Sequence, residues 1–192
     1  ITSVNDMVGR VDLLETDAAI DHWKTNGLDL TEILQPATLP QEFLGAYAIH
    51  QQDHELDKAL DNQLMALAEP AIVRGEAVHA ELPILNTNRV VGAMLSNKII
   101  REVGPDMLPE GTIHFKFHGS AGQSLGCWLA RGVTLEVEGD ANDFVGKGMA
   151  GGKIVLRPPQ NSRFSSQLAP IMGNTCLYGA TGGRLYASGC AG

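Results

Sequence analysis

Two glycine-bearing motifs in this sequence have spacings that could support catalysis or cofactor binding. Gly122-Gln123-Ser124-Leu125-Gly126 matches GxSxG, in which a serine on a tight strand-to-helix turn is activated by a histidine. That chemistry requires a histidine after the serine, but the last histidine of the chain is His118, and a strand-like segment follows at Val133. We therefore expect Ser124 to occupy a turn and not to act as a nucleophile.

The second motif, Gly146-Lys147-Gly148-Met149-Ala150-Gly151, matches the GxGxxG pattern of dinucleotide-binding proteins. In those proteins the glycines let a pyrophosphate approach the N-terminus of a helix. Here the next element is strand-like, from Lys153 to Leu156, so no helix dipole would face the phosphate. The motif therefore predicts a glycine-rich turn and no bound cofactor.

Two carboxylates in a glycine-rich segment, Asp140 and Asp143, could suggest a calcium-binding β-roll, in which carboxylates recur from repeat to repeat. The preceding glycine-rich segment has Ser120 and Gln123 at the matching positions, so these carboxylates do not recur. We expect each aspartate to hydrogen bond within its own turn.

The remaining candidate ligands are histidines and cysteines. His114 and His118 would share one strand face but have no third ligand beside them, so a structural role is expected. The cysteines Cys127, Cys176 and Cys190 form no CxxC pair and are odd in number, which argues against a zinc site and a disulfide framework. We expect them to be small buried hydrophobic residues in a reducing compartment, and we expect no catalytic, cofactor-binding or metal-binding residue in this chain.

The segments that carry these motifs form an internal repeat. When residues 113–132 are laid over residues 133–152, glycines, alanines and the alternating apolar residues of a strand all coincide. The coinciding pairs are Gly119 with Gly139, Gly126 with Gly146, Gly132 with Gly152, Ala121 with Ala141, Ala130 with Ala150, and Ile113, Phe115 and Phe117 with Val133, Leu135 and Val137.

A third copy follows at a spacing of 31 residues instead of 20, so that residues 148–154 align with residues 179–185. We call this spacing the longer step. The additional residues of this step must loop out, and the polar stretch 158–166 is suited to that. Residues 189–192 then repeat the pattern of residues 119–122.

A repeat of roughly 20 residues with alternating strands predicts a mainly β fold: a right-handed parallel β-helix, or solenoid, with a helical N-terminal extension. Glycines are needed at its corners, where the backbone turns with positive φ or passes close to the next coil. The predicted structural glycines are Gly119, Gly122, Gly126, Gly132, Gly139, Gly146, Gly148, Gly151, Gly152, Gly179, Gly182 and Gly183.

The part before the repeat has a different composition. Residues 1–110 hold 18 of the 22 acidic residues and only 6 of the 22 glycines. We place a domain boundary between residues 52 and 53, with β-helix coils from about residue 111. The expected elements are a helix capped by Asp17, a helical row at Leu56, Leu60, Leu64 and Leu67 that ends at Pro70, a strand through Ile72, Val73 and Val78, and a helix capped by Thr87 or Asn88 that ends at Gly104.

Charge and hydropathy exclude several partners. A net charge of -8 repels phosphate backbones, and no Lys/Arg run interleaves with aromatic residues, so no nucleic-acid partner is expected. No apolar run approaches the ~18 residues of a membrane span, and the first residues lack a secretory pattern. We expect a cytoplasmic protein without a membrane partner.

Three long glycine-rich strings closely resemble the C-terminal glycine-rich (GXGXG) domain of the glutamate synthase large (alpha) subunit: residues 119–126, 139–148 and 173–183. The resemblance extends to residues 88–92. It also includes residues 7–10 and 22–24, which are similar to the tail of the FMN-bearing synthase region. On this resemblance, residues 1–52 are a connector from that region and residues 53–192 are the glycine-rich domain, truncated at its C-terminus.

The resemblance implies an oxidoreductase of the glutamine amidotransferase type, which converts glutamine and 2-oxoglutarate to two glutamates with reducing equivalents. FMN and an iron–sulfur cluster are implied for the parent enzyme and none for this chain. The implied partners are the amidotransferase and FMN-binding domains of the same polypeptide, together with a small electron-donating subunit. The alternative is a glycine-rich β-helix subunit of another oxidoreductase, such as formylmethanofuran dehydrogenase, although residues 7–10 favour glutamate synthase.

Overall fold

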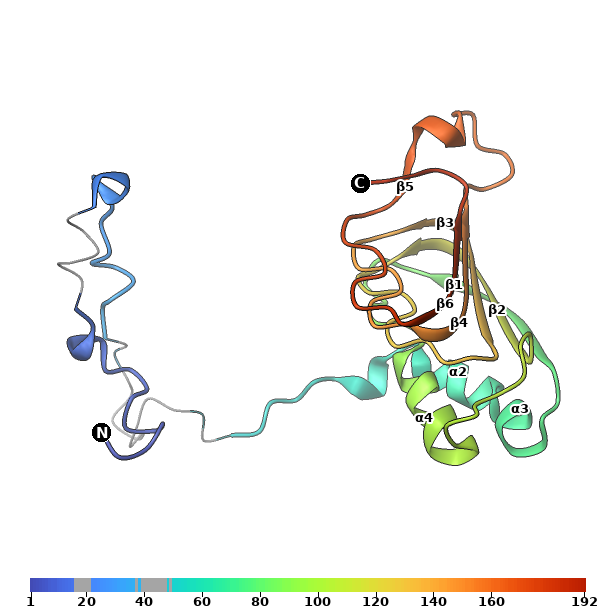
Figure 1. The fold of residues 1–192 in the computed structure, drawn as a ribbon, viewed down its shortest axis with the longest axis horizontal. Helices are drawn as coiled ribbons and strands as arrows, with labels where there is room; N and C mark the ends of the chain where they lie inside the picture. The colour runs from blue at the N-terminus through green and yellow to red at the C-terminus, as the bar shows by residue number, and fades with distance from the viewer. Residues whose placement is uncertain (16–21, 37, 39–47, 49) are drawn as a thin grey trace. The chain divides into compact units, whose positions relative to one another are not determined.

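The computed structural model describes residues 1–15, 22–36, 38, 48 and 50–192 (Figure 1). The chain divides into two compact units, Ile1–His54 and Glu55–Gly192. In the first unit the described residues form two short 3-10 helices, η1 (Val11–Leu13) and η2 (Trp23–Thr25). The predicted cap Asp17 lies outside the described residues. No helix within the described ranges is long and apolar enough to cross a membrane.

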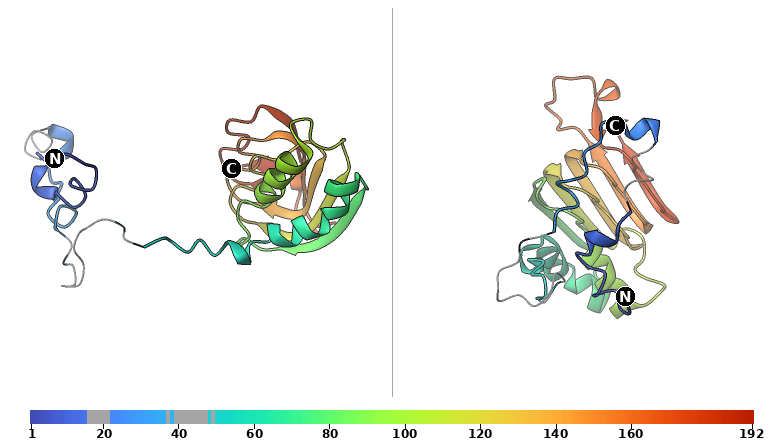
Figure 2. Two further views of the ribbon diagram at one scale, coloured as in Figure 1. Left: turned by 90° about the horizontal axis from the view of Figure 1, so that it is seen from below. Right: turned by 90° about the vertical axis from the view of Figure 1, so that its left-hand side faces the viewer.

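The second unit is built on a parallel β-sheet (Figures 1 and 2). Its strands lie in the order β1 (Val78–Ile84), β2 (Ile113–Ala121), β3 (Val133–Ala141), β4 (Ala150–Arg157) and β6 (Gly182–Ala187). Two short strands extend it, since β5 (Pro170–Met172) pairs with β3, and β7 (Cys190–Ala191) pairs with β5. The predicted mainly β, parallel architecture is therefore confirmed.

The strand register follows the sequence repeat. Ile113 lies opposite Val133, and Phe115 lies opposite Leu135, as the alignment of the first two copies predicted. Ile154 lies opposite Leu185, as the longer step to the third copy predicted. Register is specified strongly here because a slip by one residue would turn every apolar side chain to the opposite face of the sheet.

The additional residues of the longer step lie between β4 and β5. Residues 158–169 connect these two strands and include the 3-10 helix η4 (Ser166–Leu168). Beyond this connection Met172 lies opposite Ala141 on one side and Ala191 on the other. Because Ala121 also pairs with Ala141, Ala191 occupies the position that the repeat predicted for it.

The core lies on one face of the sheet, where alternate strand residues are buried. Phe115, Phe117, Leu135 and Ile154 are completely buried. Helix α4 (Ala93–Val103) contributes Leu95 and Ile99 to the same core. Figure 1 shows this helix below the strands, next to α2 (Asp61–Leu67) and α3 (Glu69–Arg74).

The helical segments before the sheet differ from the prediction. The row from Leu56 to Leu67 is divided between the 3-10 helix η3 (Leu56–Lys58) and helix α2 (Asp61–Leu67). Pro70 does not end a helix; it lies in the first turn of α3 (Glu69–Arg74), where its missing N–H has no intrahelical partner to lose. Ile72 and Val73 were predicted in a strand, but both belong to α3.

Helix α4 also begins differently from the prediction. Its N-cap is Gly92, at φ 97°, so the predicted caps Thr87 and Asn88 are wrong. Asn88 instead accepts a hydrogen bond from the Leu85 N–H and holds the preceding turn. The predicted end of the helix at Gly104 is confirmed.

Candidate functional site

The turns that join the strands are themselves stacked. Backbone hydrogen bonds connect consecutive turns, from Ser124 N–H to Asp143 O (2.9 Å) and from Phe144 N–H to Asn174 O (2.9 Å). A second row joins Gly146 N–H to Leu125 O at 2.8 Å. We call residues 86–92, 122–132, 142–149 and 173–181 the turn stack. It continues the sheet register outside the strands.

The dihedral angles of the turn stack also repeat. Gly126 and Gly146 both have φ 67°, and Ser124 and Phe144 both have φ 62°. A side chain at positive φ is strained, and glycine avoids that strain. The two earlier motifs therefore lie in turns that lead into strands, and Ser124 is not followed by the helix that a nucleophile elbow requires.

Some of the predicted glycines are also required by close approach between turns and strands. A Cβ at Gly152, which has φ 70°, would lie 2.7 Å from Ala130 O and 2.7 Å from Val133 O. A Cβ at Gly179, at φ 67°, would meet nothing within 4 Å. Glycines with the same backbone conformation are therefore constrained to different degrees.

The predicted glycines lie in three kinds of place. They are found within strands, next to strands, and inside turns. Gly119, Gly139, Gly151, Gly152, Gly182 and Gly183 are in strands; Gly122 directly follows β2 and Gly132 directly precedes β3; and Gly126, Gly146, Gly148 and Gly179 are in turns.

A polar ladder crosses the turn stack at Gln123, Asp143 and Asn174. Asp143 Oδ1 accepts a hydrogen bond from the Asn174 N–H at 2.8 Å, and its Oδ2 accepts one from Gln123 Nε2 at 3.2 Å. The Asn174 N–H, followed by the Gln123 amide, lowers the pKa of Asp143. The prediction that Asp143 bonds within its own turn is wrong, because it joins the two neighbouring turns. Asp140 lies in β3, where its side chain is exposed.

Both histidines of β2 contact carboxylates on neighbouring strands. His114 Nε2 lies 3.1 Å from Glu136 Oε2, and His118 Nε2 lies 2.8 Å from Glu81 Oε2. Arg157 also binds Glu136, with its Nε at 3.0 Å. Within the described part of the chain, no three His, Cys, Asp or Glu side chains are grouped to hold a metal ion.

The cysteines occupy three different environments. Cys127 is buried, as predicted, and burial raises the pKa of its thiol. Cys176 is half-buried, and its Sγ donates to Gly173 O at 3.3 Å. Cys190 is exposed, so the prediction of a buried residue is wrong there. It lies in β7, at the edge of the extended sheet, where no further strand covers it among the described residues.

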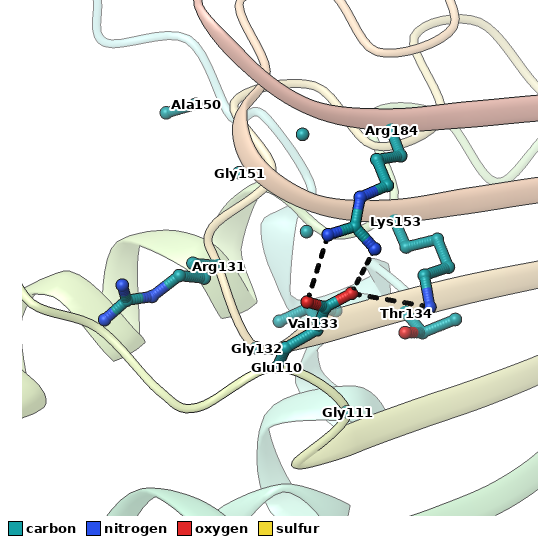
Figure 3. Close-up of a pocket in the computed structure, with 12 residues that line it drawn as sticks. Glu110, Gly111, Arg131, Gly132, Val133, Thr134, Ala150, Gly151, Lys153 and Arg184 are labelled. Atoms are coloured by element: carbon teal, nitrogen blue, oxygen red, sulfur yellow. Dashed lines mark hydrogen bonds and ion pairs between the residues drawn. The ribbon is translucent and has the colours of Figure 1, made fainter.

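A shallow cavity of about 240 Å³ lies where the strands begin (Figure 3). Glu110 occupies its centre, with Oε1 2.6 Å from Arg184 Nη1 and 3.6 Å from Lys153 Nζ. Lys153 and Arg184 lie opposite each other on β4 and β6. The carboxylate therefore connects the segment before β2 with the strand at the far edge of the sheet, and it neutralises part of the positive charge in the cavity.

Two bridging residues were not identified from the sequence. Asp61 on α2 is almost completely buried, and its carboxylate accepts hydrogen bonds from the N–H groups of Gly92 (2.9 and 3.1 Å) and Leu95 (3.1 Å) at the start of α4. Burial raises the pKa of Asp61, and the hydrogen bonds oppose that effect. Glu110 is the other residue. Neither belongs to the repeat, so no local sequence signal marked its partner.

The second unit thus consists of parallel strands joined by stacked, glycine-bearing turns. Its carboxylates Asp61, Glu110 and Asp143 hydrogen bond to other segments of the chain. These features define a repeat scaffold. The chain matches the family described as "GXGXG motif" over residues 61–192, and it belongs to that family.

Relatives of the whole chain are glutamate synthases. It is 45% identical over 189 residues to "Glutamate synthase [NADH]" of Schizosaccharomyces pombe, and the match includes 98% of this chain and 9% of that protein. It is 38% identical over 190 residues to "Glutamate synthase [NADPH] large chain" of Bacillus subtilis, and the match includes 98% of this chain and 12% of that protein. It is 38% identical over 192 residues to "Ferredoxin-dependent glutamate synthase, chloroplastic" of Spinacia oleracea, again with 98% and 12% covered. The chain thus spans about a tenth of the length of these relatives.

Proposed function

We propose that this chain is the glycine-rich structural part of a glutamate synthase polypeptide. The observation that carries the proposal is the 45% identity to a glutamate synthase across 98% of the chain. The whole polypeptide would convert glutamine and 2-oxoglutarate to two glutamates with reducing equivalents. The catalytic steps would take place in its other domains.

The geometry of the second unit supports a structural role. Asp61, Glu110 and Asp143 each bridge segments that are distant in the sequence, and their carboxylates are occupied by those contacts. In the proposed architecture each strand and its turn form one coil of a right-handed parallel β-helix, and eleven of the twelve predicted glycines, all except Gly179, allow the coils to approach. The stacked hydrogen bonds of the turns support this arrangement.

The cofactors of the proposed enzyme would be FMN and an iron–sulfur cluster, both held outside this chain. Thiolates hold such clusters, but Cys127, Cys176 and Cys190 do not occupy equivalent positions of the repeat and form no group with other ligands among the described residues. The residues present therefore do not fit a cluster site.

The partners would be the amidotransferase and FMN-binding domains of the same polypeptide, with residues 1–52 as the connector and the glycine-rich domain from residue 53. A small electron-donating subunit would complete a cytoplasmic enzyme. Relatives at 38–45% identity are named for NADH, NADPH and ferredoxin. Since this segment is similar in all three, we infer that it does not select the electron donor.

The test uses the full-length polypeptide that contains this segment. We expect it to form glutamate from glutamine and 2-oxoglutarate, and we expect Gly152→Ala to lower its melting temperature while kcat and KM in the cold stay unchanged. Gly179→Ala is the matched control, because a Cβ there meets no neighbour. Loss of kcat without loss of thermal stability would contradict a structural role, and absence of glutamate formation would refute the assignment.

A further inference from the structure

Four exposed apolar side chains and one that is half-buried, Phe144, lie along the turn stack. We call Val90, Trp128, Phe144, Leu177 and Tyr178 the turn ridge. Trp128 is 58% exposed and Tyr178 is 62% exposed. The turns that carry them are hydrogen bonded side by side, for example from Trp128 N–H to Lys147 O (2.8 Å) and from Phe144 N–H to Asn174 O (2.9 Å). The ridge is therefore one surface that crosses successive turns.

Four members of the ridge, Val90, Trp128, Phe144 and Leu177, have a positive φ, which strains any residue other than glycine. Trp128 has φ 53° and Leu177 has φ 59°. At the corresponding positions of neighbouring turns the chain has glycine, at Gly148 and Gly146. Glycine would remove the strain, so the large side chains must contribute something that glycine cannot.

Contact inside the stack accounts for only part of that contribution. Trp128 lies over Gly148, where a Cβ would be 2.6 Å from the indole Cδ1. Leu177 lies over Gly146 in the same way, with its Cδ2 at 2.8 Å. Each side chain fills the space left by a glycine, yet more than half of Trp128 remains in contact with solvent. Exposed apolar surface of this kind marks an interaction site.

The outer face of the sheet provides the contrast. Its charged residues are paired with one another, as in the contacts of Glu136 with His114 and Arg157 and of Glu138 with Arg157. Because its charges are paired and hydrophilic, that face can remain exposed to solvent. Lys147 lies beside the turn ridge: its Nζ is 5.5 Å from the centre of the Phe144 ring, and none of the carboxylates among the described residues forms an ion pair with it. Few charges and exposed Trp and Tyr side chains are typical of the centre of a protein interface.

The length of the relatives indicates what covers the ridge. In them this segment is 9–12% of one polypeptide, so the other domains are covalently attached and present at high effective concentration. We infer that the turn ridge packs against another domain of the same polypeptide, which presents an apolar surface with a carboxylate opposite Lys147. The inference rests on the proposed function and adds the surface through which the scaffold would act.

Hydroxyl-radical labelling of the full-length polypeptide tests this interface. The labelling rate of Trp128 and Tyr178 is measured in the native protein and divided by the rate of the same residue in denaturant. We expect both to be labelled many-fold more slowly in the native state, whereas Tyr186 on β6, which is 52% exposed, remains accessible. Native rates of Trp128 and Tyr178 close to the denatured rates would overturn the inference.

A variant and two controls separate the explanations. Trp128→Glu should restore rapid labelling of Tyr178, because a buried charge opposes the contact; Tyr186→Glu should not. Protection that disappears on dilution would assign the ridge to a second copy of the chain and overturn a contact within one polypeptide.

Glutamate formation is measured on the same sample. An active enzyme with an accessible ridge contradicts only the interface, and an inactive polypeptide with a protected ridge contradicts only the proposed function.

Discussion

Replacing Gly152 with alanine should destabilise the second unit strongly. The new Cβ would lie 2.7 Å from two backbone oxygens, Ala130 O and Val133 O, and 2.9 Å from Leu129 Cδ2. The side chain of Leu129 can rotate away. The two oxygens cannot move independently, because Val133 begins β3 and pairs with Ile113 of β2. The backbone must therefore shift to accept the methyl group.

The expected cost has two parts. A non-glycine residue at φ 70° costs about 1–2 kcal/mol, and overpacking against fixed backbone costs a further ~1–3 kcal/mol. Gly152→Ala should thus lower the free energy of unfolding by about 2–5 kcal/mol. Gly179→Ala has nearly the same φ, 67°, and no neighbour within 4 Å, so only the first part applies.

Urea unfolding of the chain and both variants, followed by circular dichroism, measures the two costs. The informative quantity is the difference between the variants, since the φ term is common to them. We expect Gly152→Ala to be the less stable by about 1–3 kcal/mol. Equal stabilities would show that the contact of Gly152 with the preceding strand is not tight, and would refute the close-approach argument.

Four other outcomes are expected. Asp61→Ala should cost about 2–4 kcal/mol in urea unfolding, because two buried N–H groups at the start of α4 lose their acceptor; an effect below about 1 kcal/mol would contradict this. The lowered pKa of Asp143 stabilises the fold above pH 3.8 and this contribution is lost as the pH falls below that value. The stability difference between the chain and Asp143→Asn should therefore shrink from pH 7 to pH 3, and a constant difference would refute the linkage. The purified chain should show neither bound FMN, FAD or NADPH nor glutaminase or glutamate synthase activity; stoichiometric flavin in its absorption spectrum, or glutamine hydrolysis, would be the contrary result. Amides 184–188, in the edge strand β6 and directly after it, should exchange hydrogen faster than amides 133–137 of the central strand β3, and equal protection would show that the edge is closed.

The strand register was predictable because it depends on local requirements that recur. Glycines at corresponding turn positions and alternating apolar residues both repeat with the coil, so two independent patterns indicated the same alignment. The longer step to Leu185 was predictable for the same reason. Its additional residues were recognised by their polarity, as they lack the alternation of a strand.

The helices before the sheet were predicted less well because their signals are ambiguous. Pro70 is compatible with either the end or the first turn of a helix, and Ile72 and Val73 have high strand propensity but belong to α3. Packing decided between these possibilities, since Ile72 belongs to the common core. Tertiary burial overrode the local preference.

The sequence by itself determined the parallel order of the repeats, their register and the positions where only glycine avoids strain, because each depends on neighbouring residues and on a fixed period. The tertiary structure alone decided the long-range polar contacts. Asp61 caps α4 across 31–34 residues, and Glu110 binds Arg184 across 74 residues. Such contacts have no period, and a single carboxylate in a sequence does not indicate which distant N–H or guanidinium it will meet. Only folding brings those groups within hydrogen-bond distance.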